Sequence, residues 1–352
     1  MNRDSAVESL WWAARPGVGV RLLRVFLIPF ALLVASAARL RAWAYRRGTL
    51  KTFRAPCPVI AVGNLTVGGT GKTPFVRRVA TWLVRHGYRP VVLQRGYGAD
   101  IPGRGIDEEG ASLEASVPGL RVIRSTELRA GGGDWSFATE PRVVVLLDDG
   151  FQRQSVRRDL DVLLIDASRP FGNGWTLPAG PLRESVASAA RAVLIIVTRA
   201  DAHPEAASDV VDRMRSAAPR SAIVLARHAP TILVRSGTSP ESLRNRKVWL
   251  LSAVGNPAAF ESTVAGLGAE ILGHSVFADH ADPPLVAWTS AAKRARAAGA
   301  DLLLTTGKDA PKIPDATFEL PVDALEVQVE PIGDADAFDR LIANAVTKER
   351  SS

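Results

Sequence analysis

Cysteine is nearly absent from this chain of 352 residues, in which Cys57 is the only one. A single cysteine excludes an internal disulfide framework and fits a protein of a reducing compartment. Internal repeats and low-complexity tracts are also lacking. The composition, with 47% hydrophobic and 23% charged residues, is that of a globular protein. The length allows one large domain or two ordinary ones, with an ample core.

Excess charge is lacking over most of the chain. The formal net charge is +8, and residues 1–54 alone carry ten basic and two acidic side chains. The remainder is neutral, with 34 basic and 34 acidic residues. The basic excess therefore indicates a local anionic partner for the N-terminal segment, and we expect no nucleic-acid partner.

A hydrophobic run of bilayer length is missing as well. The charge-free stretch Val25–Ala38 has fourteen residues, whereas a spanning helix needs roughly 20. If the segment is helical, Arg21 and Arg39 lie five turns apart on one face, and Pro29 is expected to kink the helix. Aromatic rings that favour membrane interfaces flank the run: Trp11, Trp12, Trp43 and Tyr45. We interpret the segment as an interfacial helix on an anionic membrane. An amphipathic helix packed on the protein and a cleaved signal peptide ending near Ala35-Ser36-Ala37 are the alternatives.

Apolar runs separated by helical patterns follow this segment. Six of them read as strands: residues 57–65, 89–98 with a loop at the end, 141–152 with acids at the end, 160–167, 192–201 and 221–228. The spacing of Phe75, Val79 and Leu83 predicts a helix over about 72–86. Such a pattern is typical of a parallel sheet covered by helices on both faces. A second strand and helix series begins near Lys247. We therefore expect a basic segment (1–54), a core domain (55–235) and a smaller α/β domain (236–352).

Between the first strand and the first helix stands the sequence VGNLTVGGTGKTP, Val62 to Pro74. A strand, a glycine-rich turn and a helix start place backbone N–H groups in a nest that binds phosphate. In such a loop Lys72 reaches the outer phosphates and Thr73 ligates magnesium. A strict phosphate-loop pattern has glycine where Thr66 stands. The alternative is a tight strand-to-helix turn without a ligand.

Acidic and basic residues follow at other element ends. Asp148 and Asp149 end an apolar strand, where carboxylates can hold magnesium beside a phosphate loop, unless they are merely solvated. Arg183 and Glu184 end the Gly- and Pro-rich stretch 172–185, a shaped loop that could bring them to phosphate and metal. Late in the chain stand residues whose role depends on the second domain: Asp279, His280, Lys308 and Asp309.

The ordered series of these pieces resembles the tetraacyldisaccharide 4′-kinases of lipid A synthesis. The pieces are RAPCPVIAVGNLTVGGTGKTP, QRGYG, LLDDGFQ, RRDLDVLLIDA, GNGWTLPAGPLRES, FADHADP and TTGKDAPK. The family also has threonine at the position of Thr66. The resemblance implies a P-loop NTPase-like α/β fold with a smaller C-terminal α/β domain and a membrane-associated N-terminal helix. It also implies an ATP- and Mg²⁺-dependent monomer at the cytoplasmic face of the bacterial inner membrane, which phosphorylates the 4′-hydroxyl of a tetraacylated glucosamine disaccharide 1-phosphate.

The same resemblance implies roles for individual residues. The triphosphate would lie against Thr66, Val67, Gly68, Gly69, Thr70, Gly71, Lys72 and Thr73. The metal ligands would come from Thr73, Asp148, Asp149 and Glu184. Lys72 and Arg183 would neutralise the transferred group. His280 would act as base with an aspartate of a Gly-Asp-Glu motif, for which Asp107 is the candidate and Glu108 the alternative.

Three departures separate this chain from the family pattern. The Gly-Asp-Glu motif is degenerate (GIDEEG), Arg153 stands in place of a histidine, and Gly307 stands in place of a glutamate. A weakened enzyme that binds nucleotide at a membrane is therefore one alternative. A GTPase-like switch is the other, because Thr198–Asp201 faintly resembles a guanine-reading motif. Against a switch, Phe151 breaks the required Asp-x-x-Gly spacing.

Overall fold

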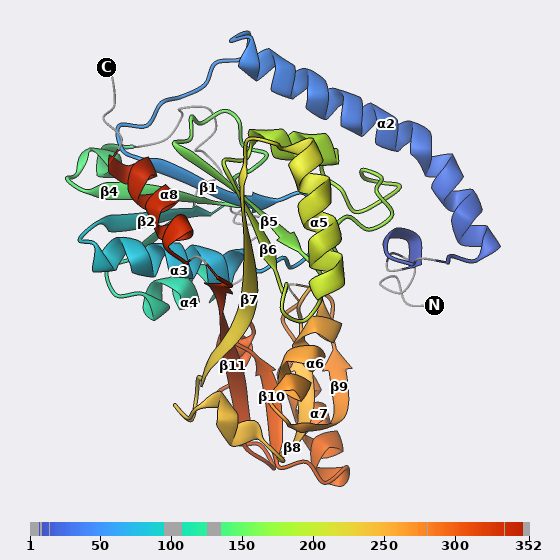
Figure 1. Ribbon diagram of the computed structural model, residues 1–352. Coiled ribbons are helices and arrows are strands. Elements are labelled where there is room, and N and C mark those ends of the chain that lie inside the picture. The colour runs from blue at the N-terminus through green and yellow to red at the C-terminus, as the bar shows by residue number, and fades with distance from the viewer. Residues whose placement is uncertain are drawn as a thin grey trace. The chain divides into compact units, whose positions relative to one another are not determined.

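A computed structural model describes residues 7, 9–13, 15–94, 108–124, 135–279, 281–333 and 335–347 of the chain. The chain divides into two compact units (Figure 1). Unit 1 comprises residues 1–104, 114–227 and 330–352, and unit 2 comprises residues 105–113 and 228–329. The last 23 residues thus belong to unit 1, whereas the sequence led us to expect one continuous C-terminal domain over 236–352.

Parallel strands form the sheet of unit 1. They are β1 (Val59–Asn64), β2 (Arg89–Gln94), β3 (Arg121–Arg124), β4 (Val143–Asp148), β5 (Leu160–Asp166), β6 (Leu194–Thr198) and β7 (Ala222–Leu233). Their order is β3-β2-β4-β1-β5-β6-β7, and neighbouring strands pair in parallel. All six residues of β1 are buried, as expected for a strand between helical layers. The predicted parallel α/β sheet is confirmed.

Helices cover this sheet on both faces. Helix α3 (Lys72–Arg85) connects β1 to β2 in one direction along the sheet, and α5 (Pro204–Ala217) connects β6 to β7 in the other. Because such crossovers are right-handed, opposite directions place the two helices on opposite faces. The C-terminal helix α8 (Ala335–Thr347) packs beside α3, where the rings of Phe75 and Phe338 meet edge to face at 5.5 Å. This buried contact explains why α8 belongs to unit 1.

Unit 2 has its own parallel sheet. The strands are β8 (Lys247–Ser252), β9 (Glu270–Val276), β10 (Leu302–Thr306) and β11 (Val322–Pro331), in the order β11-β10-β8-β9. Helices α6 (Pro257–Gly266) and α7 (Leu285–Ala297) accompany it, and Trp288 of α7 is fully buried in its core. A short helix α4 (Glu108–Ser116) begins within unit 2 and ends in unit 1, and β7 and β11 also run from one unit into the other.

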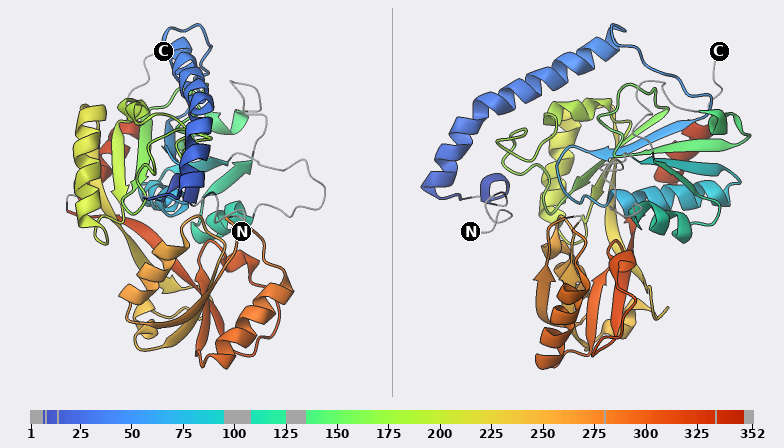
Figure 2. Two further views of the ribbon diagram at one scale, coloured as in Figure 1. Left: turned by 90° about the vertical axis from the view of Figure 1, so that its right-hand side faces the viewer. Right: turned by 180° about the vertical axis from the view of Figure 1, so that it is seen from behind.

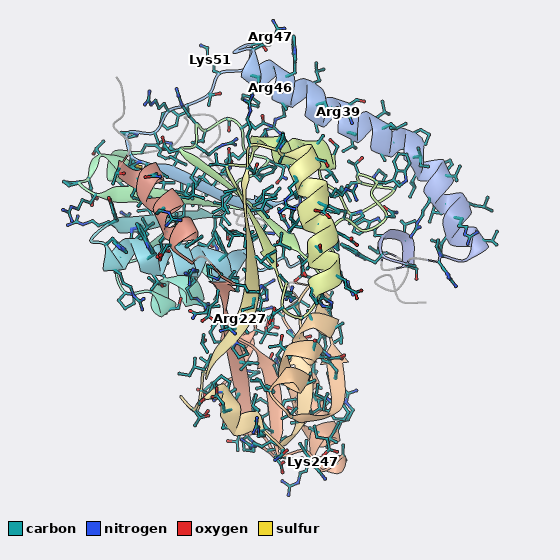
Figure 3. All side chains as sticks on the ribbon, in the orientation of Figure 1. Arg39, Arg46, Arg47, Lys51, Arg227 and Lys247 are labelled. Carbon is teal, nitrogen blue, oxygen red and sulfur yellow. The ribbon has the colours of Figure 1, made fainter. Side chains whose placement is uncertain are left out.

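Helix α2 (Val18–Arg46) is longer than the fourteen-residue apolar run on which its prediction rested. It runs along the outside of unit 1 (Figure 2). Ala31, Ala35 and Ala42 are buried on one side of it. Pro29 lies within the helix, and Figure 3 shows basic side chains towards its C-terminal end and just beyond: Arg39, Arg46, Arg47 and Lys51. In the described part of the chain, it is the one helix long and apolar enough to cross a membrane, a test that a buried core helix or a signal sequence can also pass.

Candidate active site

The carboxyl ends of the parallel strands in unit 1 meet at one edge of the sheet, where the predicted site residues gather. Of the predicted site residues, those that lie at this edge are Lys72, Thr73, Asp148, Asp149, Arg183 and Glu184. Strand β1 ends at Asn64, and the loop from Leu65 to Gly71 leads into α3, whose first residue is Lys72. Gly68 and Gly71 have φ of 112° and 83°, a backbone region that glycine enters without strain. The glycines therefore allow the tight turn that brings the loop back over the start of the helix.

Hydrogen bonds hold the phosphate loop, defined here as residues 65–73, in this shape. Asn64, which is fully buried, donates from Nδ2 to Oγ1 of Thr70 at 3.0 Å. The amide of Val67 donates to the carbonyl of Pro181 at 2.9 Å, and Thr66 forms an antiparallel bridge with Leu182. Since the Val67 amide is already bonded, we expect Gly68 to Thr73, and not Val67, to supply the amides that bind phosphate.

Asp149 lies between two cations at the end of β4. Its carboxylate is 3.5 Å from Nζ of Lys72 and accepts a hydrogen bond of 2.5 Å from Nη1 of Arg183. Burial acts to raise the pKa of the Asp149 carboxyl, but the charges of Lys72 and Arg183 and their hydrogen bonds lower the pKa overall. Asp149 is therefore ionised at neutral pH. Its carboxylate holds the side chains of Lys72 and Arg183 near the N-terminus of α3.

The turn that carries Asp149 depends on close backbone approach. Asp149 has a φ of 53°, which is uncommon for a residue with a side chain. A Cβ at Gly150 would lie 2.6 Å from Cβ of Leu147, and one at Gly63 would lie 2.7 Å from Cβ of Phe151. Both glycines are thus required for the DDGF turn to pack against β1.

The candidate metal ligands have different surroundings. Asp148 Oδ2 accepts a hydrogen bond from Nε2 of Gln94 at 3.3 Å. Glu184 is buried and pairs with Nη2 of Arg191 at 2.7 Å. Among the described residues there is no group of three or more His, Cys, Asp or Glu side chains that could hold a metal by themselves. The described oxygen donors, such as the Asp148 carboxylate, fit Mg²⁺, which usually takes one or two carboxylates and completes its shell with water and phosphate.

Two residues near the phosphate loop went unnoticed in the sequence. Asn64 anchors the loop through Thr70, and Gln152 donates from Nε2 to the carbonyl of Asn64 at 2.9 Å. Gln152 is the last residue of the DDGFQ motif, so the motif supports both the acid pair and the phosphate loop. The sequence does place Asn64 at the end of an apolar run. A polar side chain that is buried at such a position needs a hydrogen-bond partner, and this could have indicated its role.

In unit 2, Asp279, Lys308 and Asp309, which the sequence marked as candidates, take part in a network of hydrogen bonds and ion pairs. Asp309 is fully buried and accepts hydrogen bonds from the Ala253 amide at 3.0 Å, Thr306 Oγ1 at 2.8 Å and Lys312 Nζ at 2.8 Å. Lys312 also donates to the Ala281 carbonyl at 2.9 Å. Lys308 pairs with Asp279 at 3.1 Å. These contacts tie the TTGKDAPK stretch to the residues on either side of position 280. His280 and Asp107 themselves lie outside the described residues.

The departure at position 307 has a structural counterpart. A Cβ at Gly307 would lie 2.6 Å from Oε2 of Glu326. A carboxylate from β11 therefore occupies the space beside the backbone where a side chain at position 307 would begin.

Comparisons with known proteins find relatives that match nearly the whole chain. The family model of tetraacyldisaccharide-1-P 4'-kinase matches residues 23–347. The tetraacyldisaccharide 4'-kinase of Anaeromyxobacter sp. (strain K) is 36% identical over 349 residues, covering 92% of this chain and 90% of that protein. That of Geobacter metallireducens is 38% identical over 311 residues, covering 83% and 88%. A crystal structure of LpxK from Aquifex aeolicus in complex with ATP superposes with a TM-score of 0.69 at 26% identity, covering 92% of this chain and 99% of that one.

Proposed function

This chain belongs to the tetraacyldisaccharide 4′-kinase family, and we propose that the site at the carboxyl edge of the unit 1 sheet performs its phosphoryl transfer. The protein is an ATP-dependent kinase of lipid A synthesis that phosphorylates the 4′-hydroxyl of tetraacyldisaccharide 1-phosphate. The observation that carries the assignment of the site is the set Lys72, Asp149 and Arg183, held together beside a glycine-rich loop at a helix N-terminus.

The phosphate loop binds the triphosphate in this proposal. Amides from Gly68 to Thr73 donate to phosphate oxygens, and the N-terminus of α3 favours the negative charge. Lys72 and Arg183 neutralise the charge that spreads over the transferred phosphoryl group. Asp149 orients both cations, so that little reorganisation is needed when the γ-phosphate arrives.

Asp148 and Thr73 are the residues that we propose to hold Mg²⁺. Asp149 already binds two cations and Glu184 binds Arg191, so those two carboxylates are less suited to act as ligands. When bound, Mg²⁺ would offset the negative charge of the triphosphate. Thr73 is the second residue of α3, directly after Lys72. It therefore lies at the helix N-terminus, beside the phosphate loop.

The transfer itself breaks the bond between the γ-phosphorus and the β–γ bridging oxygen of ATP, which leaves with ADP, and forms a bond from that phosphorus to the 4′-oxygen. The hydroxyl proton must pass to a base, because a sugar hydroxyl is a weak nucleophile. By the family resemblance, His280 with Asp107 or Glu108 takes this role. The nearest described residues, Asp279 and Ala281, are bound by Lys308 and Lys312.

The lipid substrate explains the exposed surface of α2. Leu22, Phe26, Leu33 and Leu40 follow one another at helical spacing and are 67, 68, 68 and 64% exposed. An apolar strip of this kind, combined with nearby basic side chains, favours insertion into an anionic membrane surface. We propose that the enzyme acts as a monomer at the cytoplasmic face of the inner membrane, where ATP is present.

A labelled-phosphate assay tests this function. The purified chain is incubated with γ-labelled ATP, Mg²⁺ and tetraacyldisaccharide 1-phosphate in detergent, and the lipid is analysed for label. We expect labelled lipid with ATP and little with GTP. Fast GTP hydrolysis without any labelled lipid would contradict the assignment and favour a nucleotide switch.

A further inference from the structure

One loop of unit 1 connects α2 with the phosphate loop. It covers residues 172–185, and its last three residues are Arg183, Glu184 and Ser185. Thr176 near its middle is buried and donates from Oγ1 to the carbonyl of Ala31 at 2.7 Å. Ala31 is itself fully buried on the inner side of α2. A buried threonine hydroxyl therefore fastens the loop to the membrane helix.

The segment before α2 is fastened to the same loop. Trp11 donates from Nε1 to the carbonyl of Pro178 at 3.1 Å, and its own carbonyl accepts from the amide of Asn173 at 3.0 Å. Asn173 also donates from Nδ2 to the carbonyls of Leu10 and Ala179, at 3.2 and 2.8 Å. The first half of the loop is thus bonded to two separate parts of the N-terminal region.

The second half of the loop is bonded to the phosphate loop. Leu182 lies in register with Thr176 on one side and with Thr66 on the other. The amide of Leu177 donates to the carbonyl of Leu182 at 2.8 Å, and the amide of Arg183 donates to the carbonyl of Leu65 at 2.7 Å. The guanidinium of Arg183 then reaches Asp149. From Ala31 to the site there is consequently a series of hydrogen bonds, which the backbone joins at Thr176–Leu177 and at Leu182–Arg183.

We propose that Thr176 is a positioning residue, which uses α2 as a fixed support to hold Arg183 and the first residues of the phosphate loop in place. The proposal rests on the function of Arg183 proposed above. The side chain of Thr176 bonds to Ala31 and its backbone lies beside Leu182, so in this proposal it acts through Leu182 and Arg183. Docking of α2 on a membrane would, by the same route, stabilise the arrangement that transfers phosphate.

Thr176→Val tests the proposal, because valine keeps the shape of threonine and removes the hydroxyl. With saturating lipid we expect kcat to fall roughly tenfold, the effect of about one buried hydrogen bond, while KM for ATP changes by less than about twofold. Thr176→Ser retains the hydroxyl and should restore most of the activity. Thr263→Val is the matched control: Thr263 also donates to a helical carbonyl, that of Ala259 at 2.8 Å, but in unit 2, and we expect no change in kcat.

A double-mutant cycle with Arg183→Ala distinguishes positioning from general damage. If Thr176 acts through Arg183, Thr176→Val should cause little further loss in the Arg183→Ala background. Losses that multiply, a Thr176→Val enzyme as active as the wild type, or a loss that serine does not restore would each overturn the proposal. Should Thr176→Val not fold, Trp11→Phe removes a different anchor, the indole N–H that donates to the Pro178 carbonyl, and the same expectations apply to its own cycle with Arg183→Ala.

Hydrogen exchange measured by mass spectrometry gives a readout that does not depend on activity. Thr176→Val should raise exchange at least threefold in peptides that contain Leu177, Leu182 and Val67, and leave a peptide from β5 unchanged. Unchanged exchange at those three positions would refute the link. If the wild-type chain failed to label the lipid while this exchange pattern was observed, the proposed function would fail and the mechanical link would stand.

Discussion

Asp149→Asn is the substitution whose effect follows most directly from the geometry of the site. It keeps the size of the side chain but removes the charge that lies between Lys72 and Arg183. Breaking a buried ion pair from one side costs about 3–5 kcal/mol. Here 23% of the Asp149 side chain and 27% of that of Arg183 are exposed, so solvent screens part of the interaction. We therefore expect the free energy of unfolding without nucleotide to fall by about 2 kcal/mol.

Urea unfolding of the full chain, with and without the substitution, measures this difference. Asp212→Asn is the matched control, because Asp212 forms a pair with Arg215 at 3.3 Å in which both side chains are more than 70% exposed, at 71 and 72%. We expect the control to change the free energy of unfolding by less than about 0.5 kcal/mol. An equally small change for Asp149→Asn would refute the claim that the Asp149 carboxylate holds two cations in place.

The pH dependence of the same difference follows from the lowered pKa of Asp149. A carboxyl whose folded pKa lies below its ordinary value of 3.8 stabilises the folded state above that value. The contribution is lost as the pH falls through the folded pKa. The difference between the wild type and Asp149→Asn should thus be constant from about pH 5 to 8 and shrink below about pH 4.

Three other variants test the roles of the phosphate loop, the proposed metal ligand and helix α2. Lys72→Ala removes a charge beside the transferred group, and it should lower kcat by a factor of about 10³ in the labelled-phosphate assay; a loss below tenfold would contradict its role. Asp148→Asn should raise the Mg²⁺ concentration for half-maximal activity by at least about tenfold, as measured by titration, because Asp148 is the proposed carboxylate ligand; an unchanged titration would move that role to Asp149. Phe26→Glu combined with Leu33→Glu should reduce binding to anionic vesicles by at least about tenfold in a flotation assay, whereas Val193→Glu, at an exposed apolar residue of unit 1 outside α2, should not.

Much of the fold could be predicted from the sequence because its strands are continuous apolar runs. A strand buried on both faces, such as β1, leaves few alternatives to a parallel sheet between helices. The helix start at Lys72 was also evident, since glycines precede it and apolar residues recur along one face. The position of α8 was not evident, because nothing local indicates which unit the apolar face around Phe338 covers.

The site could be predicted only in part. Motifs identified Lys72, Asp149 and Arg183, because phosphate chemistry requires charged groups at strand ends and a glycine-rich turn. They gave no sign that Asp149 binds both cations or that Glu184 binds Arg191, since those contacts join residues far apart in the chain. The proposed role of Thr176 could not be predicted from the sequence either. A threonine in a Gly- and Pro-rich loop is common, and the hydrogen-bond partner of Thr176 is a backbone carbonyl 145 residues away.

The most direct test of the central claim is a crystal structure of the full chain with Mg²⁺ and a non-hydrolysable ATP analogue. We expect the β- and γ-phosphates to accept hydrogen bonds from amides between Gly68 and Thr73, and Nζ of Lys72 to contact the γ-phosphate. A nucleotide bound elsewhere, or a triphosphate that leaves those amides without contact, would contradict that claim.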